Sequence, residues 1–588
     1  MKMTSKSIAV LPFVNMSSDA DNEYFSDGIT EEIINALTKV QGLKVIARTS
    51  SFSFKGKNID VREIGKKLGV STVLEGSVRK EFNRVRITSQ LISADDGIHI
   101  WSESFDKELE DIFAVQDEIS ILIANKIRDN FGHLEIEDHL VKESTKDVTA
   151  YDFFLKGRFH QLKWKPESIK KAIEFYDKAI ECDSQYAKAY YGNLQCYGLL
   201  AAWGYMDQEE GFQKAILNFQ KAKEIDTNLP EYYQSFVGKA FWGEWNFKAA
   251  FDYIQKALEM DQHYSDALEA MTELFIANGY FDAAEKFINK ALDTDPLSAN
   301  HNYTLAHINY LQKKYSKAIS LIDGVLQINN DLSLAAELKA VCLLRLKNKT
   351  EFDEYIKDLS RPDLLKLLYD VINNKFKLDN SVLDELKNAS ENKNQLVPYE
   401  LYILANSDYK EEALLLLEKY IEMKRGQIIN YKFEPLLEPL HNLHGFNELH
   451  ISNLDKNEIE IKDKSEKSSK IDNEEIENLA EKIISYLKEK KSFLNPQLSL
   501  SGLATDIDIH PNKLSFVINE KTGNNFNEFI NGFRLKHFKS IANDPEFKNI
   551  TILGLAYESG FNSKSVFNSY FKKNVGKTPK AWLDSVRG

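Results

Sequence analysis

The middle of the chain repeats with a period of about 34 residues, and this period limits the fold more than any other sequence feature. Similar segments carry a leading alanine at Ala172, Ala215, Ala250, Ala284 and Ala318, so the spacings are 43, 35, 34 and 34 residues. A second alanine follows seven positions later in four of them, and Val325 takes that place in the fifth. Each unit can form two antiparallel helices that approach closely at the small residues. One unit cannot bury its own apolar face, so the units must stack.

This pattern resembles the tetratricopeptide repeat, clearly over residues 150–345 and more weakly to about residue 450. We expect an all-α solenoid over residues 133–345, then degenerate helical repeats and a cap over residues 346–450. The nine extra residues behind the 43-residue spacing fall near 200–210 and predict a lengthened loop. The resemblance implies a concave surface for a protein partner. Because most aromatic residues of such an array are core, no groove residue is singled out.

Residues 1–132 alternate strand and helix patterns and predict a compact α/β domain. The expected strands are 8–13, 44–48, 72–78 and 85–92, and the expected helices are 27–40, 58–68 and 112–131. The strings IAVLPFVNMSSDADNEYFSDGITEEI, KVIARTSSFSFKGKN and VLEGSVRK resemble TolB-like domains. Those domains occur in bacterial regulators, next to tetratricopeptide arrays and sometimes next to nucleotide cyclase domains. The resemblance does not say what this domain binds.

Two polar clusters in this domain allow an alternative interpretation as ion-binding sites. The acidic cluster of Asp19, Asp21, Glu23 and Asp27 could bind a cation, but a solvated loop and helix start are favoured. Residues 48–51 and 55–57 could meet an anion, but a solvated turn is favoured. The chain contains no GxxxxGK[ST], GxGxxG, GxSxG or HExxH motif, and its 12 histidines have no ligand-like spacing. We therefore predict no catalytic residue, metal or cofactor, and no enzyme activity.

Residues 451–473 are polar and charged in both signs, which is typical of a flexible tether. Residues 474–588 then predict an all-α domain with two helix-turn-helix motifs. After a helix over 474–490, a short helix with Leu500, Leu503 and Ala504 leads through a turn at 506–509 to a second helix, which starts at Pro511 and ends at Gly523. The pattern returns about 50 residues later, after a long helix over 525–543, with Val566, Phe567, Tyr570 and Phe571 expected to face inward and Asn562 expected as the cap.

The tandem arrangement, which ends in GKTPKAW, resembles the DNA-binding domain of AraC/XylS-family transcription regulators over residues 474–588. The resemblance implies that both second helices enter the major groove of double-stranded DNA. Phe516 and Ser569 depart from the longer polar side chains that are common in relatives, so direct readout there is in doubt. Carried over by position, the expected DNA-binding residues are Asn512, Lys513, Ser515 and Phe516 in the first helix, Asn562, Ser563, Lys564, Ser565 and Ser569 in the second, and Lys572, Lys573 and Lys577 as phosphate contacts.

The net charge of −14 excludes a chain that coats nucleic acid along its whole length. Residues 474–588 contain 16 Lys and Arg against 13 Asp and Glu, so this part carries +3 and the remainder −17. No apolar run is long enough for a membrane helix, and the three cysteines, expected to be buried thiols, are too few for a disulfide framework, so we expect a cytoplasmic protein.

The leading hypothesis is a sequence-specific transcription regulator whose N-terminal domain receives a small-molecule or protein signal. The alternative is a tetratricopeptide scaffold for protein assembly with secondary DNA binding. The operator, the direction of regulation and the oligomeric state stay open, a homodimer among the alternatives.

Overall fold

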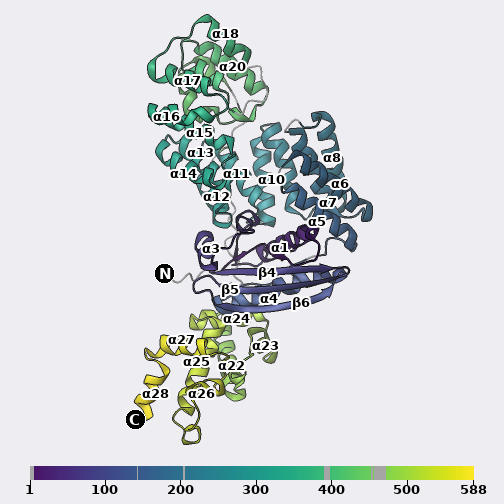
Figure 1. Cartoon of the computed structure of the whole chain (residues 1–588), viewed down its shortest axis with the longest axis vertical. Helices are drawn as coiled ribbons and strands as arrows, with labels where there is room; N and C mark the ends of the chain where they lie inside the picture. Colours follow the sequence, from purple (N-terminus) through teal and green to yellow (C-terminus); the bar gives the residue numbers. More distant parts are fainter. Residues whose placement is uncertain are drawn as a thin grey trace. The chain divides into compact units, whose positions relative to one another are not determined.

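The computed structural model describes residues 6–587, apart from 142, 164, 203, 204, 390–396, 450, 452, 453 and 456–471 (Figure 1). The chain forms two compact units. The first combines Met1–Val45, Gly56–Glu143 and Lys462–Gly588, and the second combines Ile46–Lys55 and Ser144–Ile461. Most of the predicted tether lies outside the described residues.

The N-terminal part of the first unit is a six-stranded mixed sheet with the strand order β3-β1-β4-β5-β6, and β2 pairs with β4. β1 runs parallel to β3 and β4, whereas β4, β5 and β6 form an antiparallel meander. Helices α1 and α4 pack against each other beside the sheet (Figure 1). The strands are β1 Ser7–Val10, β2 Val14–Asn15, β3 Lys44–Val45, β4 Thr72–Glu81, β5 Arg84–Ser93 and β6 His99–Glu108, and the helices are α1 Glu23–Thr38, α3 Val61–Leu68 and α4 Ile112–Phe131.

The predicted α/β character is confirmed, with differences at the edges of the elements. Helix α3 is capped by Asp60 and ends at Gly69, whose φ of +65° suits glycine. The sequence did not predict β6, because this edge strand is exposed along most of its length and Phe105 is its only buried residue. In the acidic cluster, Asp19 caps a short turn by accepting from the Asp21 amide, and the described residues hold no group of three metal-ligating side chains.

Residues 46–55 leave the sheet and pack in the second unit, where they form α2 (Arg48–Phe52). Ser50 is fully buried, and both its backbone amide and its hydroxyl donate to the carboxylate of Asp295. The Ala47 amide donates to the Thr294 carbonyl at 2.8 Å, and the Leu297 amide donates to Ser50 Oγ at 2.8 Å. The expectation of a solvated turn at 48–51 is therefore wrong, because Ser50 is buried against the carboxylate of Asp295.

The second unit is the predicted array of antiparallel helix pairs. All five leading alanines, their partners seven residues on and Val325 are buried, which confirms the close approach at these positions. Tyr176 shows the packing best, because its ring lies between Gly157 and Gly192, and a Cβ at either glycine would lie 2.6 Å from ring atoms. The helices are α5 Val148–Gln161, α6 Pro166–Cys182, α7 Ala187–Ala202, α8 Gln208–Ile225, α9 Pro230–Val237, α10 Phe247–Met260, α11 Ser265–Ala277, α12 Phe281–Thr294, α13 Ala299–Leu311, α14 Tyr315–Ile328, α15 Ser333–Arg345 and α16 Lys349–Tyr355.

The nine-residue insertion lies mostly in helices, so the prediction of a lengthened loop is wrong. Helices α7 and α8 contain 16 and 18 residues, whereas the equivalent α11 and α12 contain 13 and 14. The array starts at Val148 rather than 133, because residues 133–143 belong to the first unit. Two of the three cysteines are buried, but Cys182 is exposed.

Beyond residue 355, further helices complete the second unit, and the chain then packs back against the repeats. Glu434 accepts a hydrogen bond from the Tyr310 hydroxyl of α13, and Phe433 packs on Gly279 and Phe281. Leu454 is buried and donates through its amide to Asn278, so this part of the predicted tether belongs to the array. The helices here are α17 Pro362–Asn374, α18 Asn380–Ala389, α19 Tyr399–Ala405, α20 Lys410–Glu422 and α21 His444–Glu448.

Glu434 makes the stability of the array depend on pH. Burial raises its pKa to about 7, against a hydrogen bond from Tyr310 that lowers it. A carboxyl whose folded pKa is raised stabilises the fold fully below its ordinary pKa of 4.5, and this contribution is lost as the pH rises through 7. Between pH 6 and 8 the loss is about 1 kcal/mol of unfolding free energy.

We therefore expect the full chain to melt at a lower temperature at pH 8 than at pH 6, and Glu434→Gln to shrink this difference by about 2 °C. The control is Glu438→Gln, which removes an acid of the same segment that pairs with Lys313. An equal pH dependence in the wild type and Glu434→Gln would contradict the assignment.

Candidate DNA-binding interface

The first helix-turn-helix motif has the predicted form. Ser499 caps α23 (Leu500–Asp506), and a turn with Asp508 at a φ of +52° leads to α24, the first recognition helix (Pro511–Thr522). Pro511 takes the first helical turn and Gly523 ends the helix at a φ of +65°. Leu514, Val517 and Ile518 are buried as predicted, against the preceding α22 (Asn473–Lys490) and α23.

The second motif consists of α26 (Ile552–Glu558) and α27, the second recognition helix (Lys564–Val575). Phe567 and Phe571 face the core, but Val566 is 41% exposed, so its prediction as an inward residue is wrong. Ser563, rather than Asn562, is the cap of α27: its hydroxyl accepts from the Val566 amide, and its extended backbone precedes the first helical residue.

The two motifs are fixed to each other through α25 (Phe526–Ile541) and its surroundings. Phe538 of α25 packs on Phe567 and Phe571 of the second motif, with ring centroids 4.8 and 5.6 Å apart. The buried guanidinium of Arg534 donates to the carbonyls of Phe493 and Asn495, and burial lowers its pKa to about 10. Helix α28 (Pro579–Arg587) closes the second core through Leu583 and Trp582.

Gly560 forms the tightest point of this junction. Its φ is +89°, and a Cβ would lie 2.4 Å from the Phe493 carbonyl oxygen and 2.8 Å from Leu494 Cα. The turn of the second motif thus rests directly on backbone of the first. Because neither side can move without opening this contact, the recognition helices hold one relative orientation.

The second recognition helix presents its expected DNA-binding residues to solvent. Asn562, Lys564, Ser565, Ser569, Lys572 and Lys573 are exposed, whereas Ser563 is half-buried in its capping position. Lys573 pairs with Glu528 of α25, so it must exchange that partner to reach a phosphate. Lys564 and Lys572 have no ion-pair partner within the described part of the chain, which leaves their charges available.

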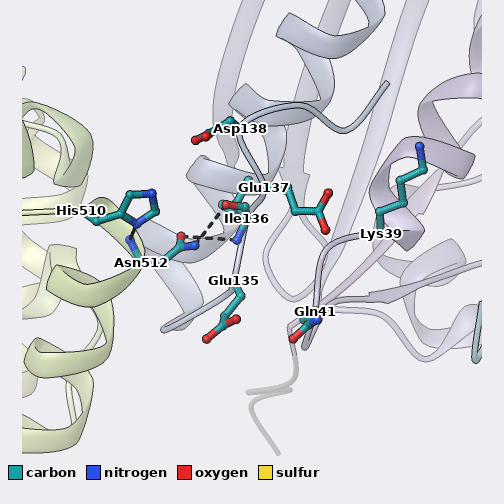
Figure 2. A pocket seen from close by; sticks show the side chains of 8 residues that line it. All are labelled: Lys39, Gln41, Glu135, Ile136, Glu137, Asp138, His510 and Asn512. Atoms are coloured by element: carbon teal, nitrogen blue, oxygen red, sulfur yellow. Dashed lines mark hydrogen bonds between the residues drawn. The ribbon is translucent and has the colours of Figure 1, made fainter. Parts of the chain in front are cut away.

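The first recognition helix differs, because its expected DNA-binding residues are partly covered. Ser515 is only 5% exposed, so its prediction as an outward residue is wrong; helical spacing places it on the flank of the stripe that Leu514 and Ile518 form. Lys513 pairs with Glu475 of α22. Asn512 and Phe516 are half-buried, and Asn512 is hydrogen-bonded to the N-terminal domain (Figure 2).

The partners of Asn512 are Arg128, near the end of α4, and the backbone of Ile136. Sequence reasoning missed both residues. The only local signal was the acidic string Glu135-Ile136-Glu137-Asp138 after α4, which gains meaning only when the fold brings it to the recognition helix.

Comparison with known families matches the three kinds of domain separately. A model of a helix-turn-helix domain matches residues 503–585, and a model of the second domain of HilA/YgeH-like transcriptional regulators matches residues 4–122. A tetratricopeptide repeat model matches residues 242–308, and a model of anaphase-promoting complex subunit 3 matches residues 277–351. The chain therefore carries an AraC-type helix-turn-helix domain, a HilA-like regulator domain and tetratricopeptide repeats.

Among whole proteins, the transcriptional regulator HilA of Salmonella typhimurium is 22% identical over 382 residues, which cover 62% of this chain and 65% of HilA. A protein named putative adenylate cyclase 3, of Rhizobium meliloti, is 39% identical over 241 residues, 40% of each chain. The chain thus spans less than two thirds of the curated relatives that it matches.

Among solved structures, YrrB, a repeat protein with an unusual peptide-binding site, matches 34% of this chain and 98% of its own at 23% identity and a TM-score of 0.21. The human IFIT1 dimer matches 52% of this chain and 72% of its own at 14% identity and a TM-score of 0.32.

The junction at Gly560 can be tested by Gly560→Ala. The added Cβ meets the Phe493 carbonyl and adopts a strained φ, so we expect a loss of about 1–3 kcal/mol in stability and misaligned recognition helices. Affinity for duplexes selected from a random-sequence pool should fall at least tenfold, measured by fluorescence anisotropy. The matched control is Gly576→Ala, which has a similar φ of +75° but open space around its Cβ. If both variants lose affinity equally, backbone strain alone is responsible and the junction is not.

Proposed function

We propose that this protein is a sequence-specific, DNA-binding transcriptional regulator. The observation that carries the proposal is the rigid pair of helix-turn-helix motifs, whose second recognition helix exposes polar and basic side chains without counter-charges at Lys564 and Lys572. Two helices held in one orientation can read two segments of the major groove together, which a single motif cannot do.

In this function Asn562 and Lys564 read base edges, since both can hydrogen-bond to purines in the major groove. Ser565 and Ser569 lie on the same exposed helix and bind either bases or phosphates. Lys572, one turn further along, binds a phosphate, and Lys573 joins it when it leaves Glu528. Asn512, Lys513 and Phe516 of the first helix supply the other half of the readout. Ser563 acts as the helix cap and Ser515 as part of the helix packing.

The rest of the chain supports a role in receiving a signal or a partner. The tetratricopeptide repeats, which a family model matches over residues 242–308, form an array of the kind that presents a surface to a protein partner. The cyclase name belongs to the Rhizobium relative. The chain has none of the catalytic motifs sought above, so we propose a non-enzymatic regulator that acts in the cytoplasm, where its DNA lies.

A scaffold for protein assembly is the second candidate, favoured by the tetratricopeptide repeats. The two functions make different demands on the DNA-binding domain. If scaffolding is the main function, variants that cannot bind DNA will leave the cellular phenotype of the protein unchanged. Genome-wide mapping of bound DNA, with the wild type and Lys564→Ala compared, separates the candidates.

Lys572→Ala tests the phosphate contact. The change removes one unpaired positive charge, so affinity should fall by a similar factor for all duplexes, and the slope of log affinity against log salt should become shallower by about 1. Titration of labelled duplexes with the full chain at several salt concentrations measures both. The control is Lys488→Ala, the same change at an exposed position of α22. Salt-insensitive binding, or no binding to any selected duplex, would refute DNA binding as the function.

No helix within the described ranges combines the length and apolar character that a membrane crossing requires.

A further inference from the structure

The side-chain amide of Asn512 is hydrogen-bonded at both its oxygen and its nitrogen within the first unit. Its Oδ1 accepts from Arg128 Nη1 at 2.7 Å and from the Ile136 amide at 3.3 Å, and its Nδ2 donates to the Ile136 carbonyl at 3.1 Å. Figure 2 shows Asn512 pointing at Ile136, with the two hydrogen bonds to that residue side by side. One recognition-helix side chain thus forms a two-point pair with a backbone donor and a backbone acceptor.

This two-point pair has the same chemistry as the reading of an adenine. In the major groove an adenine offers an N6 donor and an N7 acceptor, and an asparagine pairs with both through its Oδ1 and Nδ2. The backbone N–H and C=O of Ile136 offer the same donor and acceptor to the same two atoms. Asn512 cannot bind Ile136 and a base edge at the same time.

The contact extends along the first motif beyond Asn512. Asn525, the cap of α25, donates to the Asn130 carbonyl at 2.6 Å, and Asn527 donates to Asn130 Oδ1 at 3.0 Å. The His133 ring meets the Phe516 ring edge-on, with centroids 5.6 Å apart. Two residues expected to read DNA, Asn512 and Phe516, are therefore both engaged.

The contacting part of the N-terminal domain contains several acidic residues. Asp129, near the end of α4, is 7% exposed. Glu135, Glu137 and Asp138 are exposed around a cavity of about 320 Å³ that His510 and Asn512 also line (Figure 2). Near the first recognition helix, the N-terminal domain thus presents these acidic residues together with the basic Lys39 and Arg128.

The same contact contains groups that favour its opening. Burial raises the pKa of Asp129 to about 6 and lowers the pKa of His133 to about 4, so the contact disfavours the charged form of each group. The interface is also polar, and the cavity beside it admits water. Such a contact is suited to exchange rather than to permanent association.

We propose that residues 128–136 form a docking surface for the first recognition helix of the same chain, and that this surface competes with DNA for Asn512 and Phe516. The proposal rests on the proposed DNA-binding function. Because the two motifs move as one body, docking of the first also prevents the second from binding in register. A signal that loosens the end of α4 would then increase DNA binding.

Release of the docked helix is tested in the full chain with Arg128→Ala/Asn130→Ala. These changes remove two of the polar contacts, those of Arg128 with Asn512 and of Asn130 with Asn527, and leave every expected DNA-binding residue in place, so affinity for a selected duplex should rise about tenfold. The matched control is Glu118→Gln, at an exposed position of the same helix that pairs with Lys107. Unchanged affinity in the double variant, together with salt-dependent binding by the wild type, would overturn the docking proposal and leave the DNA-binding function intact.

A cross-link tests the contact without relying on affinity gains. Asn130→Cys and Asn527→Cys, in a Cys182→Ser background, replace two side chains that are 3.0 Å apart at their polar atoms. A short bismaleimide should link them in the absence of DNA, duplex should suppress the reaction, and the linked chain should bind DNA at least tenfold more weakly. No cross-link, or a linked chain with normal affinity, would overturn the proposal. Failure of every variant and the wild type to bind any duplex would instead overturn the proposed function, and the competition with it.

Discussion

The packing of one helix-turn-helix motif on the backbone of the other is the contact on which the DNA-binding part depends. Arg534 and Gly560 both meet the carbonyl of Phe493, the first by donating to it and the second by leaving room for it. A buried guanidinium without these carbonyls would be costly, and any side chain at 560 would separate the motifs. The two recognition helices therefore behave as one rigid reader, so any partner that occupies one of them controls both.

In the repeats the controlling factor is the close approach of helices at small residues. The alanines are buried throughout, and Tyr176 fits only because Gly157 and Gly192 have no side chains. The array cannot end on an open apolar face. The chain therefore folds back onto the repeats, where Tyr310 donates to Glu434 and the Leu454 amide donates to Asn278. Because the carboxyl of Glu434 is buried, the stability of this closure depends on pH.

Features that depend on local pattern were predictable from the sequence, and features that depend on distant contacts were not. The alanine spacing, Pro511 and Gly523 each act within one helix or turn, and the structure confirms them. Ser563 is the helix cap because its hydroxyl accepts a hydrogen bond from the Val566 amide. By residue type alone, Asn562 was an equally good candidate for the cap. Ser50 was expected in a solvated turn and Asn512 on the DNA-reading face, since their partners Asp295 and Ile136 lie hundreds of positions away.

The segment 46–55 has a mechanical consequence. It is bounded on both sides by residues of the α/β domain, Val45 at the end of β3 and Gly56, yet it packs with the helical repeats through Ser50 and Asp295. The chain passes between the two units at residues 45–46, 55–56, 143–144 and 461–462, so a single cut at residue 144 would leave them covalently joined.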